Sequence, residues 1–202
     1  MKLYITPGSP YARMARIMVI EKKLEGRVET VSATTRTTDS LYYHINPSGR
    51  VPYLVCDNGM GLEESALICS YLDHLDGNPV FDLPHDDRAL EARRLEALAR
   101  SMLDGLSVWS REKVRPENEQ SPRVIAHESG RARRMADLWE REIGHPLMQG
   151  PLNMIQVTLA CGLGMEARNP DLHWRPHHPE LCGWFDRIAA RPSFAKTAPP
   201  GA

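Results

Sequence analysis

Residues 46–73 read NPSGRVPYLVCDNGMGLEESALICSYLD, which predicts a turn, a short β-hairpin and the start of a helix. Pro52 stands directly before the apolar residues 53–56. A proline there lacks the N–H donor of a strand and fixes φ, so we expect a special backbone geometry, with a cis peptide bond as one option. Glu64 and Ser65 stand where the helix begins, and the free N–H groups of a helix start favour a carboxylate. The proline and the helix start therefore predict two walls of a small binding site.

The composition is that of an ordinary globular protein, with 25 Lys+Arg against 26 Asp+Glu and a formal net charge of −1. A chain so close to neutral lacks the basic surface by which proteins bind nucleic acid or anionic membranes. No apolar run approaches the roughly 18 residues that a membrane span needs. The first residues do not have the pattern of a signal peptide. We therefore expect a protein of the cytoplasm, with neither nucleic acid nor membrane as a partner.

The four cysteines predict free thiols in a reducing compartment. They show no Cys-x-x-Cys pair, and each stands among apolar residues, where a free cysteine behaves as a small hydrophobe. The histidines of residues 173–178 (HWRPHH) occupy a predicted loop without Cys or carboxylate at ligand spacing. We therefore expect no metal site. The cysteines are Cys56, Cys69, Cys161 and Cys182.

The N-terminal part predicts an α/β domain with a mixed sheet. Ser9 followed by Pro10 marks a helix start, with serine as the N-cap and proline at the first helical position. A strand before that helix and a strand after it imply a parallel pair joined by a crossover helix. The later hairpin adds two antiparallel strands. The predicted order is β-α-β-α-β-β-α: a strand at 2–6, a helix from 10 to Gly26, a strand at 28–32, a helical turn at 41–45, and the hairpin and helix of residues 53–73.

The remainder of the chain predicts an all-helical domain. Turn residues are dense at 76–79 (DGNP), and strand signals vanish beyond residue 86. Apolar residues at helical spacing predict a long helix ending near Pro116, and Asn153 with Gln156 resembles a capping box before a buried helix. The expected organisation is a first domain at 1–76, a linker at 77–85, a helical domain at 86–194 and a flexible tail at 195–202.

This order of elements, with Pro52 before the third strand, resembles the cytosolic glutathione transferases, and most of all the short bacterial members with a Ser-Pro-Phe/Tyr start. The matching motifs run in family order over nearly the whole chain. The resemblance implies a thioredoxin-like domain followed by a helical bundle, and an enzyme that uses glutathione as a co-substrate without a further cofactor. The motifs are 9–13 (SPYAR), 46–52 (NPSGRVP), 63–68 (EESALI), 104–106 (DGL), 184–188 (WFDRI) and 191–194 (RPSF).

The resemblance also implies how glutathione would bind. The tripeptide would lie as an added strand beside Val51, whose backbone next to Pro52 pairs with its cysteinyl unit. Ser65 would take the γ-glutamyl carboxylate through its hydroxyl and N–H, and Glu64 would take the α-amino group. Arg50 is placed to meet the glycyl carboxylate, although the family varies at this position.

The long helix of the second domain supplies further expected site residues. In the homodimers of the family, an acidic residue from the partner's long helix often completes the γ-glutamyl site, and Asp104 is the candidate. The same helix lines the pocket for the electrophile in the family. The expected walls of this pocket are Met102, Leu106 and Trp109 from the long helix, together with Tyr11 from the first domain. Their helical spacing also makes Met102, Leu106 and Trp109 candidates for the core.

Ser9 is the expected catalytic residue, because the family places its thiol-activating group at this turn. A free thiol of pKa about 8.5 is only a few per cent thiolate at pH 7, and the thiolate is the nucleophile. Lowering that pKa by about 2 units requires about 2.7 kcal/mol of preferential thiolate stabilisation. Tyr11 or backbone amides are alternative donors, and Ser9 as a helix cap alone is the other interpretation. Because Ser9 and Ala12 stand where redox relatives carry Cys-x-x-Cys, dithiol exchange is excluded here.

The predicted function is transfer of the glutathione thiolate to small hydrophobic electrophiles. A glutathione-dependent peroxidase or isomerase on the same site is the first alternative. A non-catalytic adaptor with the same fold is the second, and the retained residues 50–52 and 64–65 argue against it.

Overall fold

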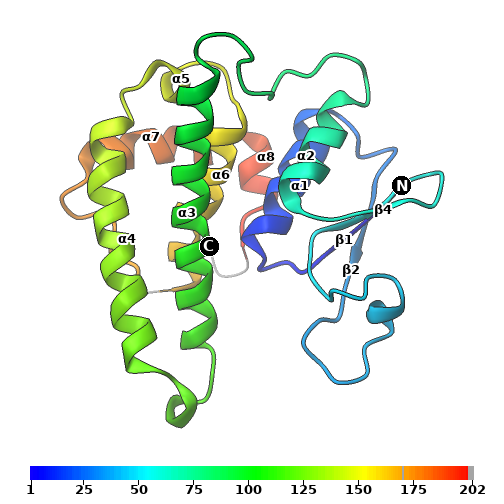
Figure 1. The fold of residues 1–202 in the computed structure, drawn as a ribbon, viewed down its shortest axis with the longest axis horizontal. Coiled ribbons are helices and arrows are strands. Elements are labelled where there is room, and N and C mark those ends of the chain that lie inside the picture. Colours follow the sequence, from blue (N-terminus) through cyan, green and yellow to red (C-terminus); the bar gives the residue numbers. More distant parts are fainter. Residues whose placement is uncertain (170, 200–202) are drawn as a thin grey trace. The chain divides into compact units, whose positions relative to one another are not determined.

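The computed structural model describes residues 1–169 and 171–199, which form two units, the first from Met1 to Asp82 and the second from Leu83 onward (Figure 1). No helix within these residues is both long enough and apolar enough to cross a membrane. The first unit contains β1 (Lys2–Ile5), α1 (Pro10–Glu21), β2 (Glu29–Ser32), the 3-10 helix η1 (Leu41–His44), β3 (Tyr53–Val55), β4 (Gly61–Leu62) and α2 (Ser65–His74). The second contains α3 (Ala89–Lys113), η2 (Glu117–Glu119), α4 (Pro122–Glu142), α5 (Pro146–Gln149), α6 (Met154–Leu163), η3 (Gly164–Arg168), α7 (Pro179–Ala189) and α8 (Pro192–Lys196).

The first unit has the predicted thioredoxin-like order, with η1 as the second helical element. Its four strands lie in the order β2-β1-β3-β4, where β1 and β2 are parallel and the other two pairs are antiparallel. Helices α1 and α2 pack side by side (Figure 1). The predicted mixed sheet is therefore confirmed, as is the all-helical character of the second unit.

The register of the sheet brings three segments of the chain to one edge. Tyr4 of β1 lies opposite Tyr53 of β3, and Leu54 of β3 lies opposite Leu62 of β4. Because both pairs are antiparallel, the end of β1 and the end of β4 meet the start of β3. The residues that follow β1, precede β3 and follow β4 thus emerge together, and these are the segments that carry Ser9, Val51 and Glu64.

Helix α1 ends earlier than the sequence predicts. It ends at Glu21 rather than near Gly26, because Lys23 adopts a left-handed φ of 54° and the Leu24 N–H turns back to the Val19 carbonyl at 2.8 Å. Left-handed backbone commonly terminates a helix, although glycine usually supplies it. The sequence prediction was wrong here because a lysine takes the position expected of the glycine.

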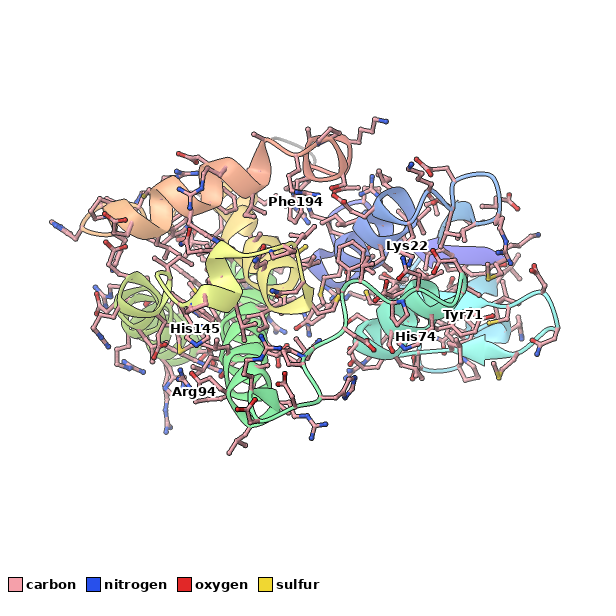
Figure 2. The ribbon with its side chains drawn as sticks, turned by 90° about the horizontal axis from the view of Figure 1, so that it is seen from above. Lys22, Tyr71, His74, Arg94, His145 and Phe194 are labelled. Carbon is pink, nitrogen blue, oxygen red and sulfur yellow. The ribbon has the colours of Figure 1, made fainter. Side chains whose placement is uncertain are left out.

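The first unit extends past the predicted domain end at residue 76. The Asp73 carboxylate of α2 accepts hydrogen bonds from the backbone N–H groups of Val80 and Phe81, at 3.1 and 2.9 Å. Phe81 is 5% exposed and belongs to the core. Lys22, at the end of α1, approaches the same carboxylate, and Figure 2 shows Lys22 and His74 in this region. Residues predicted as a linker are therefore held by the first unit.

Helix α6 is buried along its whole length in the second unit, where it packs against α3. Its cap departs from the predicted capping box. The Asn153 side chain accepts from the N–H groups of Ile155 and Gln156 at 3.0 and 3.3 Å, as a cap should. The Gln156 amide instead donates to the carbonyls of Leu147, Gly150 and Pro151. The Gln156 side chain therefore holds the segment before α6 in place, because it donates to three backbone carbonyls of that segment.

The C-terminal segment is more ordered than the predicted tail. Helix α8 includes Ala195 and Lys196, and the Thr197 side chain is 1% exposed with its hydroxyl donating to the Ser193 carbonyl at 2.7 Å. Burial of Phe194 in the core draws this segment inward. Residues 200–202 of the predicted tail lie outside the described residues.

Candidate functional site

Ser9 caps α1 at the edge of the sheet where the three segments meet. Its Oγ accepts a hydrogen bond from the Ala12 N–H at 3.2 Å. The first turn of α1 has no acidic residue, so its positive dipole end is not neutralised locally. Among the described residues no acceptor receives the Ser9 hydroxyl hydrogen. Capping uses the Ser9 oxygen as an acceptor and leaves the hydroxyl hydrogen for another partner. Ser9 can therefore cap α1 and donate a hydrogen bond to a thiolate at the same time.

Val51 and Pro52 are joined by a cis peptide bond, the special geometry that the sequence indicates. Pro52 is buried and Val51 is half-buried. Neither backbone group of Val51 has a hydrogen-bond partner in the part of the chain that the structure describes. The N–H and the C=O of Val51 are therefore both available to pair with an extended ligand.

Glu64 and Ser65 form the predicted start of α2, with Glu64 as the N-cap and Ser65 as the first helical residue. The Ser65 N–H and hydroxyl both donate to Glu64 Oε1, each at 2.8 Å. Ser65 is 1% exposed, whereas Glu64 is exposed. Two buried donors at a helix N-terminus thus converge on one carboxylate oxygen, which here belongs to the protein itself.

Three residues without a predicted role, Glu63, Asn46 and Ser48, connect the loop before Val51 with the start of α2. Glu63 Oε2 accepts from Asn46 Nδ2 at 3.0 Å and from the Ser48 hydroxyl at 2.5 Å. Asn46 is 3% exposed, and its amide also donates to the Arg50 carbonyl at 3.1 Å. The motif 46–49 indicated a turn and the pair 64–65 a helix start, but no pattern in the sequence joins these segments.

Arg50 has a fixed backbone and an exposed side chain. Its carbonyl accepts from the Tyr42 hydroxyl at 2.5 Å, and its N–H donates to Ser48 Oγ at 3.2 Å. Within the described residues the guanidinium forms no ion pair or hydrogen bond. Arg50 is therefore a cation on a rigid loop, available to an anionic group.

The predicted residues of α3 divide between the core and the surface. Met102 and Leu106 are each 1% exposed and Trp109 is 4% exposed, so all three contribute to the core of the second unit. The indole N–H of Trp109 has no acceptor among the described residues. Asp104 is exposed on the same helix, and Tyr11 on α1 is half-buried. Their assignment to an electrophile pocket, and that of Asp104 to a partner's site, remain predictions.

Among the described residues, Asp73, His74 and Asp82 form the one group of potential metal ligands close enough to share an ion. Its buried member already binds a cation, because Lys22 Nζ lies 3.2 Å from Asp73 Oδ1. The same carboxylate accepts two backbone N–H groups. The contacts of Asp73 with Lys22 and with the backbone of residues 80–81 explain its position in the structure without a metal ion. The four cysteines are free thiols, as predicted.

Comparison with known proteins identifies relatives over the whole chain. A family profile described as "Glutathione S-transferase, N-terminal domain" matches residues 8–75. The curated Escherichia coli K12 protein "Uncharacterized GST-like protein YibF" is 29% identical over 205 residues, with 100% of both chains covered.

Two crystal structures of a glutathione transferase family member from Pseudomonas fluorescens Pf-5 are similar in fold and sequence. The one with bound glutathione is 32% identical, covers 98% of each chain and has a TM-score of 0.87. The one with bound S-(propanoic acid)-glutathione is 31% identical, covers 99% of this chain and 100% of the other, and has a TM-score of 0.85.

Proposed function

Because the chain belongs to the glutathione S-transferase family, we propose that it binds glutathione at the edge of its first unit and transfers the thiolate to small hydrophobic electrophiles. The proposal assigns each part of the tripeptide to one of the three segments that meet at this edge. No further cofactor takes part in this chemistry.

The observation that carries the proposal is the pair of donors on Ser65. Its N–H and hydroxyl both bind a carboxylate oxygen, at 2.8 Å, where the dipole of α2 adds positive potential. A γ-glutamyl carboxylate requires such a site. In the proposed complex this carboxylate replaces that of Glu64, and Glu64 turns to the α-amino group of the same unit, where opposite charges attract.

The rest of the tripeptide is assigned to the segment before β3. The unpaired N–H and C=O of Val51 would pair with the cysteinyl unit as an added strand, next to the cis bond to Pro52. The exposed guanidinium of Arg50 supports its assignment to the glycyl carboxylate. In the proposed complex, the sulfur would point toward the start of α1.

Ser9 is assigned the activation of the thiol. Its hydroxyl hydrogen would donate to the thiolate while its oxygen continues to cap α1. A hydrogen bond to a charged group is worth about 1.5–3 kcal/mol, comparable with the stabilisation needed to lower the thiol pKa by 1–2 units. Tyr11, also near the start of α1, is the alternative donor.

The transfer itself is nucleophilic addition or substitution at carbon. The thiolate sulfur forms a C–S bond with the electrophile, and the displaced electron pair leaves with a leaving group or is protonated on the neighbouring carbon. A thioether of this kind, S-(propanoic acid)-glutathione, is bound in the Pseudomonas fluorescens relative, which supports the proposal. The protein would contribute orientation and thiolate stabilisation.

We further propose a homodimer located in the cytoplasm, where glutathione is kept reduced. Asp104, exposed on α3, is the residue proposed to reach the γ-glutamyl site of the partner. Met102, Leu106, Trp109 and Tyr11 are the proposed neighbours of the electrophile. Contact with largely apolar side chains would select electrophiles by hydrophobicity.

The test is a titration of the protein with glutathione by calorimetry, followed by assays with an aryl halide and with an organic hydroperoxide. Binding with aryl-halide conjugation supports the proposal. Binding with only hydroperoxide reduction favours the peroxidase alternative. Absence of glutathione binding contradicts the proposal and favours an adaptor.

A further inference from the structure

We propose that Glu63 is a positioning residue for glutathione, because its carboxylate joins the two segments that hold the opposite ends of the tripeptide. This inference rests on the proposed function. Glu63 lies between β4 and the cap of α2, directly before Glu64 and Ser65. Its carboxylate, however, is bound to the loop that carries Arg50 and Val51.

The two hydrogen bonds to Glu63 share one carboxylate oxygen. Oε2 accepts from Asn46 Nδ2 at 3.0 Å and from Ser48 Oγ at 2.5 Å. Both donors bind an ionised acceptor, and such charge-assisted hydrogen bonds are about twice as strong as neutral ones. We call Glu63, Asn46 and Ser48 the clasp.

The clasp fixes the loop through its own internal hydrogen bonds. Asn46 Oδ1 accepts from the Ser48 N–H at 3.1 Å, and Ser48 Oγ accepts from the Arg50 N–H at 3.2 Å. Asn46 Nδ2 donates to the Arg50 carbonyl at 3.1 Å. The two residues that donate to Glu63 therefore also hold the carbonyl and the N–H of Arg50, the residue immediately before Val51.

A clasp is needed because the sheet alone connects these segments weakly. Strand β4 contains only Gly61 and Leu62, and its pairing with β3 ends at Leu54 and Leu62. Beyond that pair, the Glu63 carboxylate links the two segments by accepting hydrogen bonds from Asn46 and Ser48 of the loop 46–51. A ligand that binds Val51 and Ser65 at once depends on the distance between these two residues, because each hydrogen bond weakens steeply when its geometry departs from the optimum.

The chemistry distinguishes the role of Glu63 from that of Glu64. Glu64 is proposed to contact the amino group of glutathione, whereas the Glu63 carboxylate accepts its two hydrogen bonds from Asn46 and Ser48 of the loop. Removing Glu63 should therefore weaken glutathione binding without changing the chemical step. An acceptor of the same shape at this position should preserve it.

The experiment compares Glu63→Ala, Glu63→Gln and Ser48→Ala with the wild type and with Glu29→Ala, which removes an exposed carboxylate on β2. Glutathione affinity is measured by calorimetry, and KM for glutathione and kcat with an aryl halide by steady-state kinetics. We expect Glu63→Ala to raise Kd and KM for glutathione about 10-fold and to keep kcat within about 2-fold of the wild-type value. Ser48→Ala should raise Kd and KM about 3-fold. Glu63→Gln should stay within about 3-fold of the wild type, because one amide oxygen can accept both bonds.

Hydrogen exchange of residues 46–51 gives a second measurement that does not depend on glutathione. Faster exchange in Glu63→Ala than in Glu63→Gln is expected if the clasp holds the loop. Wild-type binding with an unchanged Kd in Glu63→Ala, or equal losses in Glu63→Ala and Glu63→Gln, would overturn the role of Glu63 alone. No binding by the wild type would overturn the proposed function, and this inference with it.

Discussion

Lys22 Nζ lies 3.2 Å from Asp73 Oδ1, and the two side chains are only 4% and 2% exposed. Removing one partner of a buried pair leaves the other charge uncompensated. We expect Lys22→Met to lower the free energy of unfolding by about 3 kcal/mol in urea denaturation. Lys2→Met, on the exposed side of β1, is the control and should change it by less than about 0.5 kcal/mol. Equal effects of the two substitutions would show that the buried pair does not stabilise the first unit.

The same cluster predicts a dependence on pH. Burial lowers the pKa of Lys22, but its hydrogen bonds to Asp76 and Asp73 outweigh this and raise that pKa. The hydrogen bond from Lys22 lowers the pKa of Asp76. The Lys22 contribution is therefore complete below its unfolded pKa of about 10.4 and is lost as pH rises through the folded value. The Asp76 contribution is present above about pH 3.9 and is lost as pH falls through the folded value.

The stability gap between wild type and Lys22→Met should thus be constant between about pH 5 and about pH 9.5, and it should narrow at lower and at higher pH. Urea denaturation at a series of pH values measures it. A gap that instead widens toward high pH would contradict the assignment.

Gly49 is expected to resist substitution in the loop before Val51. Its φ is +65°, and a Cβ there would lie 2.7 Å from Tyr43 Cε1. Gly49→Ala should cost about 1–3 kcal/mol, through left-handed backbone and crowding together. Gly59→Ala is the matched control, because its φ is +84° and no atom lies within 4 Å of the added Cβ. Thermal unfolding should show a larger loss of stability for Gly49→Ala than for Gly59→Ala. Equal losses of stability would show that crowding against Tyr43 does not contribute.

Local patterns in the sequence were sufficient to predict the fold. Ser9 with Pro10 marked a helix start, Asn153 marked a cap, and Pro52 before an apolar run marked the special backbone, all of which the structure contains. Each signal depends on residues a few positions apart. The early end of α1 was missed because a lysine at φ 54° took the position expected of Gly26.

The candidate site could be predicted only where a motif carries its residues. Glu64 and Ser65 were assigned because helix starts have a recognisable composition. The bonds from Glu63 to Asn46 and Ser48 join side chains of two separate segments, and they form only after the sheet register sets β4 beside β3. No periodicity reports such a contact. The same reason explains why Lys22 and Asp73 were not paired from the sequence.

Asn153 is expected to be important for the stability of the second unit. Its side chain caps α6 through two N–H groups and donates to the Leu147 carbonyl at 2.8 Å. Asn153→Ala should lower the free energy of unfolding by about 1–2 kcal/mol. Asn153→Asp keeps the capping acceptor and loses the donor, so it should cost less. Urea denaturation of the two variants separates the contribution of the capping oxygen from that of the amide donor. An equal loss of stability in both variants would assign the effect to the hydrogen bond from Asn153 Nδ2 to the Leu147 carbonyl.

Ser9→Ala tests the activation of the thiol. In the complex with glutathione, we expect the thiol pKa to rise by about 1 unit, equivalent to about 1.4 kcal/mol. The thiolate absorbance of bound glutathione, followed against pH, measures this pKa. Ser9→Thr retains a hydroxyl and serves as the control, and Tyr11→Phe tests the alternative donor. A pKa that moves with Tyr11→Phe and not with Ser9→Ala would assign the role to Tyr11.

The central claim is that Ser65 binds the γ-glutamyl carboxylate of glutathione at the start of α2. The direct measurement is calorimetric titration of glutathione into the wild type, Ser65→Ala and Ser70→Ala, the last removing an exposed hydroxyl from the same helix. We predict that Ser65→Ala weakens binding about 10- to 100-fold, because a hydrogen bond to a charged group is lost, and that Ser70→Ala binds as the wild type does. Absence of binding by the wild type, or equal affinity of Ser65→Ala and the wild type, would contradict the claim.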